Sequence, residues 1–367
     1  MPLYMDRHDS LNATAKALAE AHKLDIEIQE KYSCRALTYW FDEGKKIAFC
    51  LIEAPDKTAV EEMHKNSHGL VPNQIIEVQS NIVEYFLGRI SDPASTKNYE
   101  QFINETAFRS IMFIDCNCLM TRSASFDEKG FGVKNILNDI IRPALKEFDG
   151  TEVKIDSEGF MASFTSVAKS IKCAKKIQAD FKEFNSKTSG TKILLSIGLS
   201  TGYPVSNNED FFGDTILLAK RLCEIAGEGG ILFSSSFKNL FETDENFEER
   251  NGSIKIINPS DEKFLNHLME LTEKVWNDEE FNVVHFSRKI GLSKAQLYRK
   301  VTALTGHSPN EFIKTYRLNK ALKFIEKRQH NISEIAYETG FGNPSYFSKC
   351  FQKRYGIRPS EFINAII

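Results

Sequence analysis

The sequence lacks long hydrophobic runs. None of its apolar stretches approaches the roughly 20 residues that a helix needs to span a bilayer, so we expect no membrane partner. The first residues, MPLYMDRHDS, also lack the basic and then apolar pattern of an export signal. Together these absences predict a cytoplasmic protein.

Cysteines are few and irregularly spaced. The seven cysteines among 367 residues are an odd number without the spacing of a disulfide framework, so we expect reduced thiols, mostly in cores. Low-complexity segments are also absent. Hydrophobic residues make up 41% and charged residues 26%, which is typical of a globular protein with sizeable cores. The length predicts two or three domains.

Charge is distributed unevenly along the chain. The formal net charge is −3, yet residues 281–367 hold 15 Lys and Arg against 5 Asp and Glu, a balance of +10. Residues 1–280 therefore carry −13. A basic end on an acidic body is typical of a polyanion-binding module joined to domains that bind no polyanion.

The basic end contains two similar helical patterns in tandem. Residues 284–306 and 332–356 each comprise an apolar helix, a turn with a glycine, and an amphipathic helix rich in Lys and Arg. This order is typical of a helix-turn-helix unit, which presents its second helix to a DNA major groove. The string AYETGFGNPSYFSKCFQKRYGIRPSEF resembles the AraC/XylS family of transcription regulators, and the resemblance covers about 100 residues. It implies sequence-specific binding to double-stranded DNA.

Helical periodicity separates two faces on these helices. The inner stripes are apolar and should pack against the partner helices: Leu297, Val301, Leu304, Phe341, Phe347 and Phe351. Gln and Arg can read adenine and guanine edges, while Lys and Ser commonly bind phosphates. The outward residues that we expect to contact DNA are Ser293, Lys294, Gln296, Arg299, Lys300, Asn343, Ser345, Tyr346, Lys349 and Lys353. The alternative for any one of them is a solvated surface position.

Residues 1–79 alternate strands and helices in the order βαββαβ. Short β-type runs, LYMDRH, RALTYWF and KIAFCLIEA, flank helical patterns at residues 12–31 and 57–66. Asp56 is the expected N-cap of the second helix. This order predicts a ferredoxin-like α+β sandwich.

Half of the eight histidines lie in the first 68 residues. His64 and His68 are four apart on a predicted helix, so both rings can face one ligand. Imidazole combined with thiolate or carboxylate suits Ni, Zn, Cu or Co. The motifs M-D-x-H, C-L-x-E-A-P-D and H-x-x-x-H-G resemble a family of small ferredoxin-like proteins that includes nickel-binding members. The resemblance implies a Ni or Zn site formed by His8, Cys50, His64 and His68; the alternatives are ordinary buried side chains and dimerisation through the sheet.

The middle of the chain has α/β character and resembles the class III nucleotidyl cyclases over roughly 130 residues. The matching pieces occur in the family's order: FID at 113–115, GTEVKIDSEGFMASF at 150–164, IGLSTG at 197–202 and DFFGDTILLAKRL at 210–222. The resemblance implies that Asp115 and Glu158 hold Mg or Mn with a nucleotide. It likewise implies that Lys154 and Asp210 read adenine and that Arg221 stabilises the transition state.

Three positions depart from the cyclase pattern. Glu158 is one methylene longer than the family's second aspartate, Leu217 replaces a transition-state asparagine, and Cys118 replaces a phosphate-loop glycine. Losing one such donor typically costs about 10²–10³ in rate. We therefore expect a pseudo-cyclase that senses a nucleotide or dimerises; a weak cyclase and a purely structural reuse of the fold are the alternatives.

The sequence thus predicts a multidomain α+β protein. Its expected parts are a ferredoxin-like, metal-binding domain (1–79), a helical linker (80–106), a cyclase-like α/β domain (107–258) and an all-α tandem helix-turn-helix domain (261–367). The predicted function is transcription regulation of AraC type by a homodimer with a nucleotide or metal effector. The alternative is an active adenylate cyclase with a regulatory DNA-binding domain.

Overall fold

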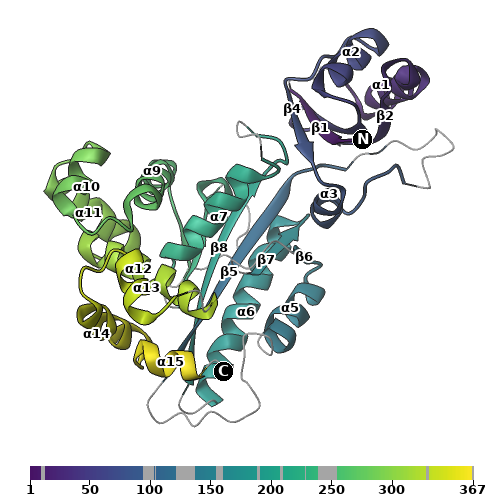
Figure 1. The fold of residues 1–367 in the computed structure, drawn as a ribbon. Coiled ribbons are helices and arrows are strands. Elements are labelled where there is room, and N and C mark those ends of the chain that lie inside the picture. The colour runs from purple at the N-terminus through teal and green to yellow at the C-terminus, as the bar shows by residue number, and fades with distance from the viewer. Residues whose placement is uncertain are drawn as a thin grey trace. The chain divides into compact units, whose positions relative to one another are not determined.

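The computed structural model describes residues 1–9, 13–93, 103, 105–120, 137–153, 160–187, 191–206, 210–227, 229–238, 254–327 and 330–365 (Figure 1). The chain forms two compact units. The first comprises Met1–Met112, Leu145–Lys172 and Ser200–Leu217, and the second comprises Phe113–Ala144, Cys173–Leu199 and Leu218–Ile367. Within the described part of the chain, no helix is long and apolar enough to cross a membrane.

The N-terminal sheet has four strands in the order β2-β3-β1-β4. Its strands are β1 (Leu3–His8), β2 (Arg35–Asp42), β3 (Ile47–Glu53) and β4 (Gln74–Val78). The helices are α1 (Ala15–Ile28), which continues into a 3-10 turn (Gln29–Tyr32), and α2 (Lys57–Ser67). β1 pairs antiparallel with both β3 and β4. The predicted ferredoxin-like sandwich is confirmed.

The start of each N-terminal helix follows from its cap. The side chain of Thr14 accepts a hydrogen bond from the Ala17 amide at 3.2 Å, which begins α1. Asp56 accepts from the Ala59 amide at 2.9 Å and begins α2, as the sequence predicted. α3 (Ser80–Leu87) follows β4 and confirms the first helix of the expected linker. Residues 94–102 and 104 of the expected linker fall outside those described.

The second sheet has six strands in the order β10-β9-β8-β5-β7-β6. The strands are β5 (Arg109–Met120), β6 (Thr151–Val153), β7 (Phe160–Phe164), β8 (Thr191–Gly202), β9 (Ile231–Phe233) and β10 (Ile254–Ile256). The helices are a π-helical turn (Leu137–Ile141) leading into α5 (Arg142–Glu147), α6 (Val167–Lys187) and α7 (Gly213–Ile225). Strands β5 to β8 repeat the strand order of the N-terminal sheet, and β9 and β10 extend it in parallel beside β8.

The C-terminal part is helical, as predicted. α9 (Pro259–Val275) leads to α10 (Val283–Ile290), α11 (Lys294–Thr305), α12 (Pro309–Lys327), α13 (Ile332–Glu338), α14 (Pro344–Tyr355) and α15 (Pro359–Ala365). The pairs α10–α11 and α13–α14 are the two predicted helix-turn-helix units, and α12 joins them (Figure 1). The predicted inner stripes are buried in both units.

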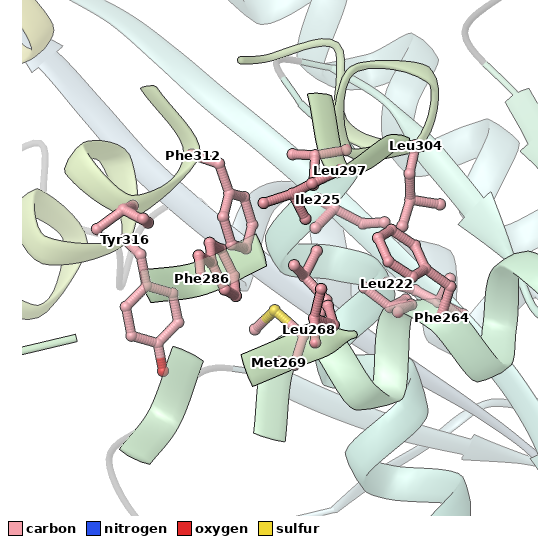
Figure 2. Packing of buried hydrophobic residues seen from close by; sticks show 14 of the residues in the cluster. Leu222, Ile225, Phe264, Leu268, Met269, Phe286, Leu297, Leu304, Phe312 and Tyr316 are labelled. Atoms are coloured by element: carbon pink, nitrogen blue, oxygen red, sulfur yellow. The ribbon is translucent and has the colours of Figure 1, made fainter. Parts of the chain in front are cut away.

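One hydrophobic core connects α7 to the first helix-turn-helix unit. Figure 2 shows Leu222 and Ile225 of α7 beside Phe264 and Leu268 of α9, with Phe286 of α10 in the same cluster. Each fully buried side chain of this kind stabilises the fold by about 1.5–3 kcal/mol. The second helix-turn-helix unit has a separate core, formed mainly with α12. Among the described residues, the first helix-turn-helix unit thus shares a buried cluster with α7, whereas the cluster of the second unit is formed mainly with α12.

Arg317 of α12 packs beside the turn of the second helix-turn-helix unit. Its Nε donates to the Trp276 carbonyl and its Nη2 to the Asp278 carbonyl, both at 2.6 Å. A Cβ atom at Gly340 would lie 2.9 Å from Arg317 Nε and 3.0 Å from the Trp276 carbonyl oxygen. The turn therefore needs glycine for its positive φ of +74° and for this close approach.

We expect Gly340→Ala to destabilise the protein more than Gly306→Ala. Both glycines have a φ of +74°, but a Cβ at Gly306 would meet nothing within 4 Å. Gly306→Ala should therefore cost only the backbone strain, about 1–2 kcal/mol. Gly340→Ala should cost about 1–3 kcal/mol more, because Arg317 must move. Chemical unfolding of both variants measures the difference, and equal losses would contradict the close approach.

Candidate metal site and DNA-binding surface

Four buried side chains converge between β1, β3 and α2. Asp6 and His8 alternate along β1 and therefore point to the same face of the sheet. Cys50 lies opposite Asp6 in the β1–β3 register, and α2 contributes His64. One ligand atom from each of these four residues lies within 4.8 Å of the others. The strand register and one helix thus suffice to assemble the group.

Asp6 is the centre of this group. Its Oδ2 lies 2.7 Å from Nε2 of His64, and its Oδ1 lies 3.3 Å from Nε2 of His8. The backbone amide of Cys50 donates to the same Oδ1 at 3.0 Å. Nδ1 of His8 is buried without a hydrogen-bond partner among the described residues. A buried imidazole nitrogen without a partner needs an explanation. Together with the nearby carboxylate and thiol groups it forms a donor set that suits a bound cation.

A second group shares His64 with the first. Asp25 of α1 and His68 lie at the other edge of the His64 ring. Nδ1 of His64 is 3.2 Å from Asp25 and 3.0 Å from Nε2 of His68. His68 Nε2 lies 3.2 Å from Asp25, and the Ser67 hydroxyl donates to Asp25 at 2.5 Å. The His64 ring is therefore held between two carboxylates.

This arrangement changes the acidity of the buried groups. Burial by itself would lower the pKa of His64, but the neighbouring Asp6 and Asp25 raise that pKa to about 10. Burial would raise the pKa of Asp6, yet the two histidines beside it hold the pKa well below its usual value. Burial, together with the charges of Asp6 and Asp25, raises the pKa of the Cys50 thiol. Without a cation, an imidazolium thus balances the carboxylates and the thiol stays protonated.

The predicted metal ligands divide between the two groups. His8, Cys50 and His64 come together, whereas His68 belongs to the neighbouring group with Asp25. Sequence reasoning missed Asp25 because no motif connects α1 to α2. The available signal was helical periodicity, since α1 buries one face that contains Leu18, Ala21, His22 and Asp25. A carboxylate on such a face needs a partner.

The opposite face of β1 contacts the chain segment before α7. Arg7 lies between Asp6 and His8, and its Nη1 donates to the Val205 carbonyl at 2.8 Å. The Tyr203 hydroxyl donates to Asp42 at 2.6 Å. The rings of Tyr203 and Phe49 stack with their centroids 5.6 Å apart. Residues of the N-terminal sheet therefore hold the segment that leads into α7.

The structure describes three of the five predicted cyclase residues, which are Asp115, Asp210 and Arg221. Lys154 and Glu158 fall outside the described residues. Asp210 is exposed, and its carbonyl accepts from the Gly213 amide at 3.0 Å at the start of α7. Asp115 lies on β5, in the second compact unit, where it lines a cavity. Cys118 lies on β5, and its side chain is not among those that the structure describes.

Arg221 points to the helix that leads into the helix-turn-helix domain. The side chain is only 3% exposed, and Nη1 donates to Asn266 Oδ1 at 2.9 Å. Its two other partners on α9 are Glu270 at 3.5 Å and Glu273 at 3.6 Å. In this conformation the guanidinium links α7 to α9. The role that the cyclase resemblance implies for Arg221, stabilising the transition state, stays a prediction.

All ten residues predicted to contact DNA are exposed. Three of them also begin the second helices. Ser293 and Gln296 form a capping box at α11, with reciprocal hydrogen bonds of 3.2 and 3.0 Å. Asn343 accepts from the amides of Ser345 and Tyr346 at α14. Lys300 Nζ lies 5.0 Å from the Phe264 ring centroid, so its stem covers the shared core.

Two family models match parts of the chain. Residues 286–365 match a helix-turn-helix domain, and residues 4–78 match the nickel responsive protein SCO4226-like family. Histidine kinase P4 of Formosa agariphila is 37% identical over 139 residues, which are 36% of this chain and 10% of that protein. The transcriptional activator RhaS of Mannheimia succiniciproducens is 34% identical over 84 residues, which are 23% of this chain and 31% of that protein. The chain thus spans about a tenth and about a third of these two curated relatives.

One solved structure is similar to part of the chain. An adenylate/guanylate cyclase/hydrolase from Silicibacter pomeroyi is 23% identical and has a TM-score of 0.31. The match covers 38% of this chain and 83% of that one. The family matches confirm both terminal resemblances: residues 286–365 are similar to AraC-type helix-turn-helix domains, and residues 4–78 to nickel-responsive SCO4226-like proteins.

Proposed function

We propose that the chain is a transcription regulator that binds double-stranded DNA and responds to a metal held by its N-terminal domain. The observation that carries the proposal is the tandem helix-turn-helix structure at residues 286–365, which matches a helix-turn-helix family model. Each second helix buries an apolar stripe and exposes a polar face with Lys, and α11 also exposes Arg299. Such a face is suited to phosphates and base edges in a major groove.

The two helix-turn-helix units suit successive parts of one DNA site. α12 joins them as a continuous helix, and each unit has its own recognition helix, α11 or α14. The charge balance of +10 in residues 281–367 supplies the attraction to the phosphate backbone. Arg299 on α11 is the side chain best suited to a bidentate contact with guanine, and Lys349 on α14 to a phosphate.

We expect Arg299→Ala and Lys349→Ala to weaken DNA binding in different ways. Arg299→Ala should cost about 1–3 kcal/mol and relax the sequence preference at one position. Lys349→Ala should weaken binding to all sequences and reduce the salt slope by about one. Fluorescence anisotropy with DNA from upstream of the protein's own coding sequence, over a range of salt, measures both. Lys182→Ala on α6, also exposed, is the control; an equal loss there, or no wild-type binding at low salt, would contradict the proposal.

The N-terminal domain is the proposed metal sensor. Asp6, His8, Cys50 and His64 would hold one divalent ion, with nickel favoured over zinc by the family match. Asp25 and His68 would orient the His64 ring. The ion would displace a proton from His64 when it binds. Mixed nitrogen, oxygen and sulfur donors favour late transition metals over Mg or Ca.

Cys50→Ser should remove the thiolate ligand, whereas Cys34→Ser should not. Both cysteines are buried in the N-terminal domain, but Cys34 donates to the Tyr32 carbonyl and lies outside both groups. Titration with Ni²⁺ should show thiolate-to-metal charge-transfer absorption in wild type and in Cys34→Ser. Cys50→Ser should lose that absorption and bind at least about 10-fold more weakly. Identical Ni²⁺ spectra in the two variants would rule out Cys50 as a ligand.

The metal has a physical route to the DNA-binding end. Arg7 holds the Val205 carbonyl on the face of β1 opposite the metal group, and Val205 precedes α7 in the chain. At the other end of α7, Arg221 binds α9 and Leu222 packs into the shared core. A change in β1 can therefore reach the first helix-turn-helix unit through one helix. The cytoplasmic location expected from the sequence is part of this proposal, because the regulator must reach DNA.

The middle domain is proposed to be a dimerisation and sensor module without catalysis. The altered positions of the cyclase pattern and the engagement of Arg221 by α9 support this interpretation. A homodimer would deliver two DNA-binding ends to repeated half-sites. Purified protein given ATP and Mn²⁺ should produce no cyclic AMP above a Lys154→Ala control. Product above that control would favour the alternative, an adenylate cyclase with a regulatory DNA-binding domain.

A further inference from the structure

A cavity of about 400 Å³ lies within the second compact unit. Its lining comes from the end of α7, from β5 and β8, from α9, from α12 and from α14. The volume falls within the roughly 300–1,000 Å³ of typical small-molecule sites, at the lower end. Such sites form preferentially where several structural elements meet.

One wall of the cavity is apolar. Ile225 of α7, Met269 of α9, and Phe312 and Tyr316 of α12 line it, and all four belong to the shared hydrophobic core (Figure 2). Because these side chains pack against one another from three helices, the wall is fixed by the fold. It offers a surface for a flat or aliphatic ligand body.

The lining also carries charged side chains of both signs. Lys320 and Lys323 of α12 and Arg354 of α14 face the cavity, together with Glu224 of α7 and Asp115 of β5. Burial raises the pKa of Glu224, and the charges of Lys220, Lys320 and Lys323 oppose that rise. Three cations against two carboxylates leave a net positive charge among the described lining residues.

We propose that this cavity binds a small organic anion, with a phosphate or carboxylate group and an apolar ring or chain. The anionic group would lie against Lys323 and Arg354, and the apolar body against Phe312 and Met269. A guanidinium and an ammonium suit such groups through charge-assisted hydrogen bonds.

The bound anion would connect the two helix-turn-helix units. α7, α9 and α12 share the core of the first unit, whereas Arg354 lies on the second helix of the second unit. Arg354 already donates to Asn319 of α12 at 3.3 Å. A ligand bridging Lys323 and Arg354 would strengthen that connection and fix the orientation of the two DNA-reading helices. This consequence rests on the proposed DNA-binding function; the binding itself does not.

The test uses the full chain and the fluorescent aromatic anion 1-anilinonaphthalene-8-sulfonate as probe. We expect saturable binding with one probe per chain. Lys323→Glu should weaken the probe's binding at least tenfold, because it reverses a charge on the cavity wall. Lys327→Glu is the matched control, since Lys327 is exposed on the same helix and does not line the cavity. Arg354→Gln, on another helix, should weaken binding as well and guards against misfolding of one variant.

Competition then identifies the anionic group. Displacement of the probe by AMP indicates a phosphate ligand, and displacement by benzoate indicates a carboxylate ligand. Equal probe affinity in the Lys323→Glu and Lys327→Glu variants, or displacement by neither competitor, would overturn the proposal. No DNA is present in this assay, so its failure would leave the proposed regulator function untouched.

Discussion

The hydrophobic contact between α7, α9 and the first helix-turn-helix unit is the constraint on which the rest of the structure depends. Leu222, Leu268 and Phe286 come from three separate helices and lie in one core. Close-packed interiors transmit displacement because they have few alternative arrangements. A movement of α7 would therefore also move α9 and the first helix-turn-helix unit. Arg221 adds a polar contact between α7 and α9. The second helix-turn-helix unit has its own core, so its position depends on α12.

In the proposed regulation, the group formed by Asp6, His8, Cys50 and His64 would supply the energy for such a movement. His64 lies between Asp6 and Asp25, and in the metal-free protein its positive charge compensates both carboxylates. A divalent ion would replace that proton and also ionise the Cys50 thiol, so metal binding would rearrange charge at the centre of β1. Arg7, on the same strand, donates to the Val205 carbonyl and would pass such a shift to the segment before α7. The segment from Val205 into α7 would thus connect the charged group beside β1 with the hydrophobic core at the end of α7.

Much of this arrangement follows from the sequence, because its signals are local. The strand LYMDRH matches β1, Asp56 caps α2, and the apolar stripes of the helix-turn-helix units are buried as expected. The convergence of His8, Cys50 and His64 was predictable, since strand order and helical spacing bring them together. Asp25 was not, because its partner lies 39 residues away on another helix. The orientation of Arg221 could not be predicted either. The family motif locates the residue in the sequence, but its partners lie on α9, which is outside that motif. The cavity arises from the packing of distant helices and leaves no sequence signal.

The most direct test of a metal-responsive DNA-binding regulator is the coupling between its two ligands. The dissociation constant of the full chain for its upstream DNA is measured at fixed salt with and without Ni²⁺, and the Ni²⁺ affinity is measured with and without DNA. Linkage requires that both affinities change by the same factor, and about 5–150-fold is typical of allosteric proteins. We expect a change in that range, and its loss in Cys50→Ser. Protein that binds both ligands with neither affinity altered by the other would contradict the proposed regulation.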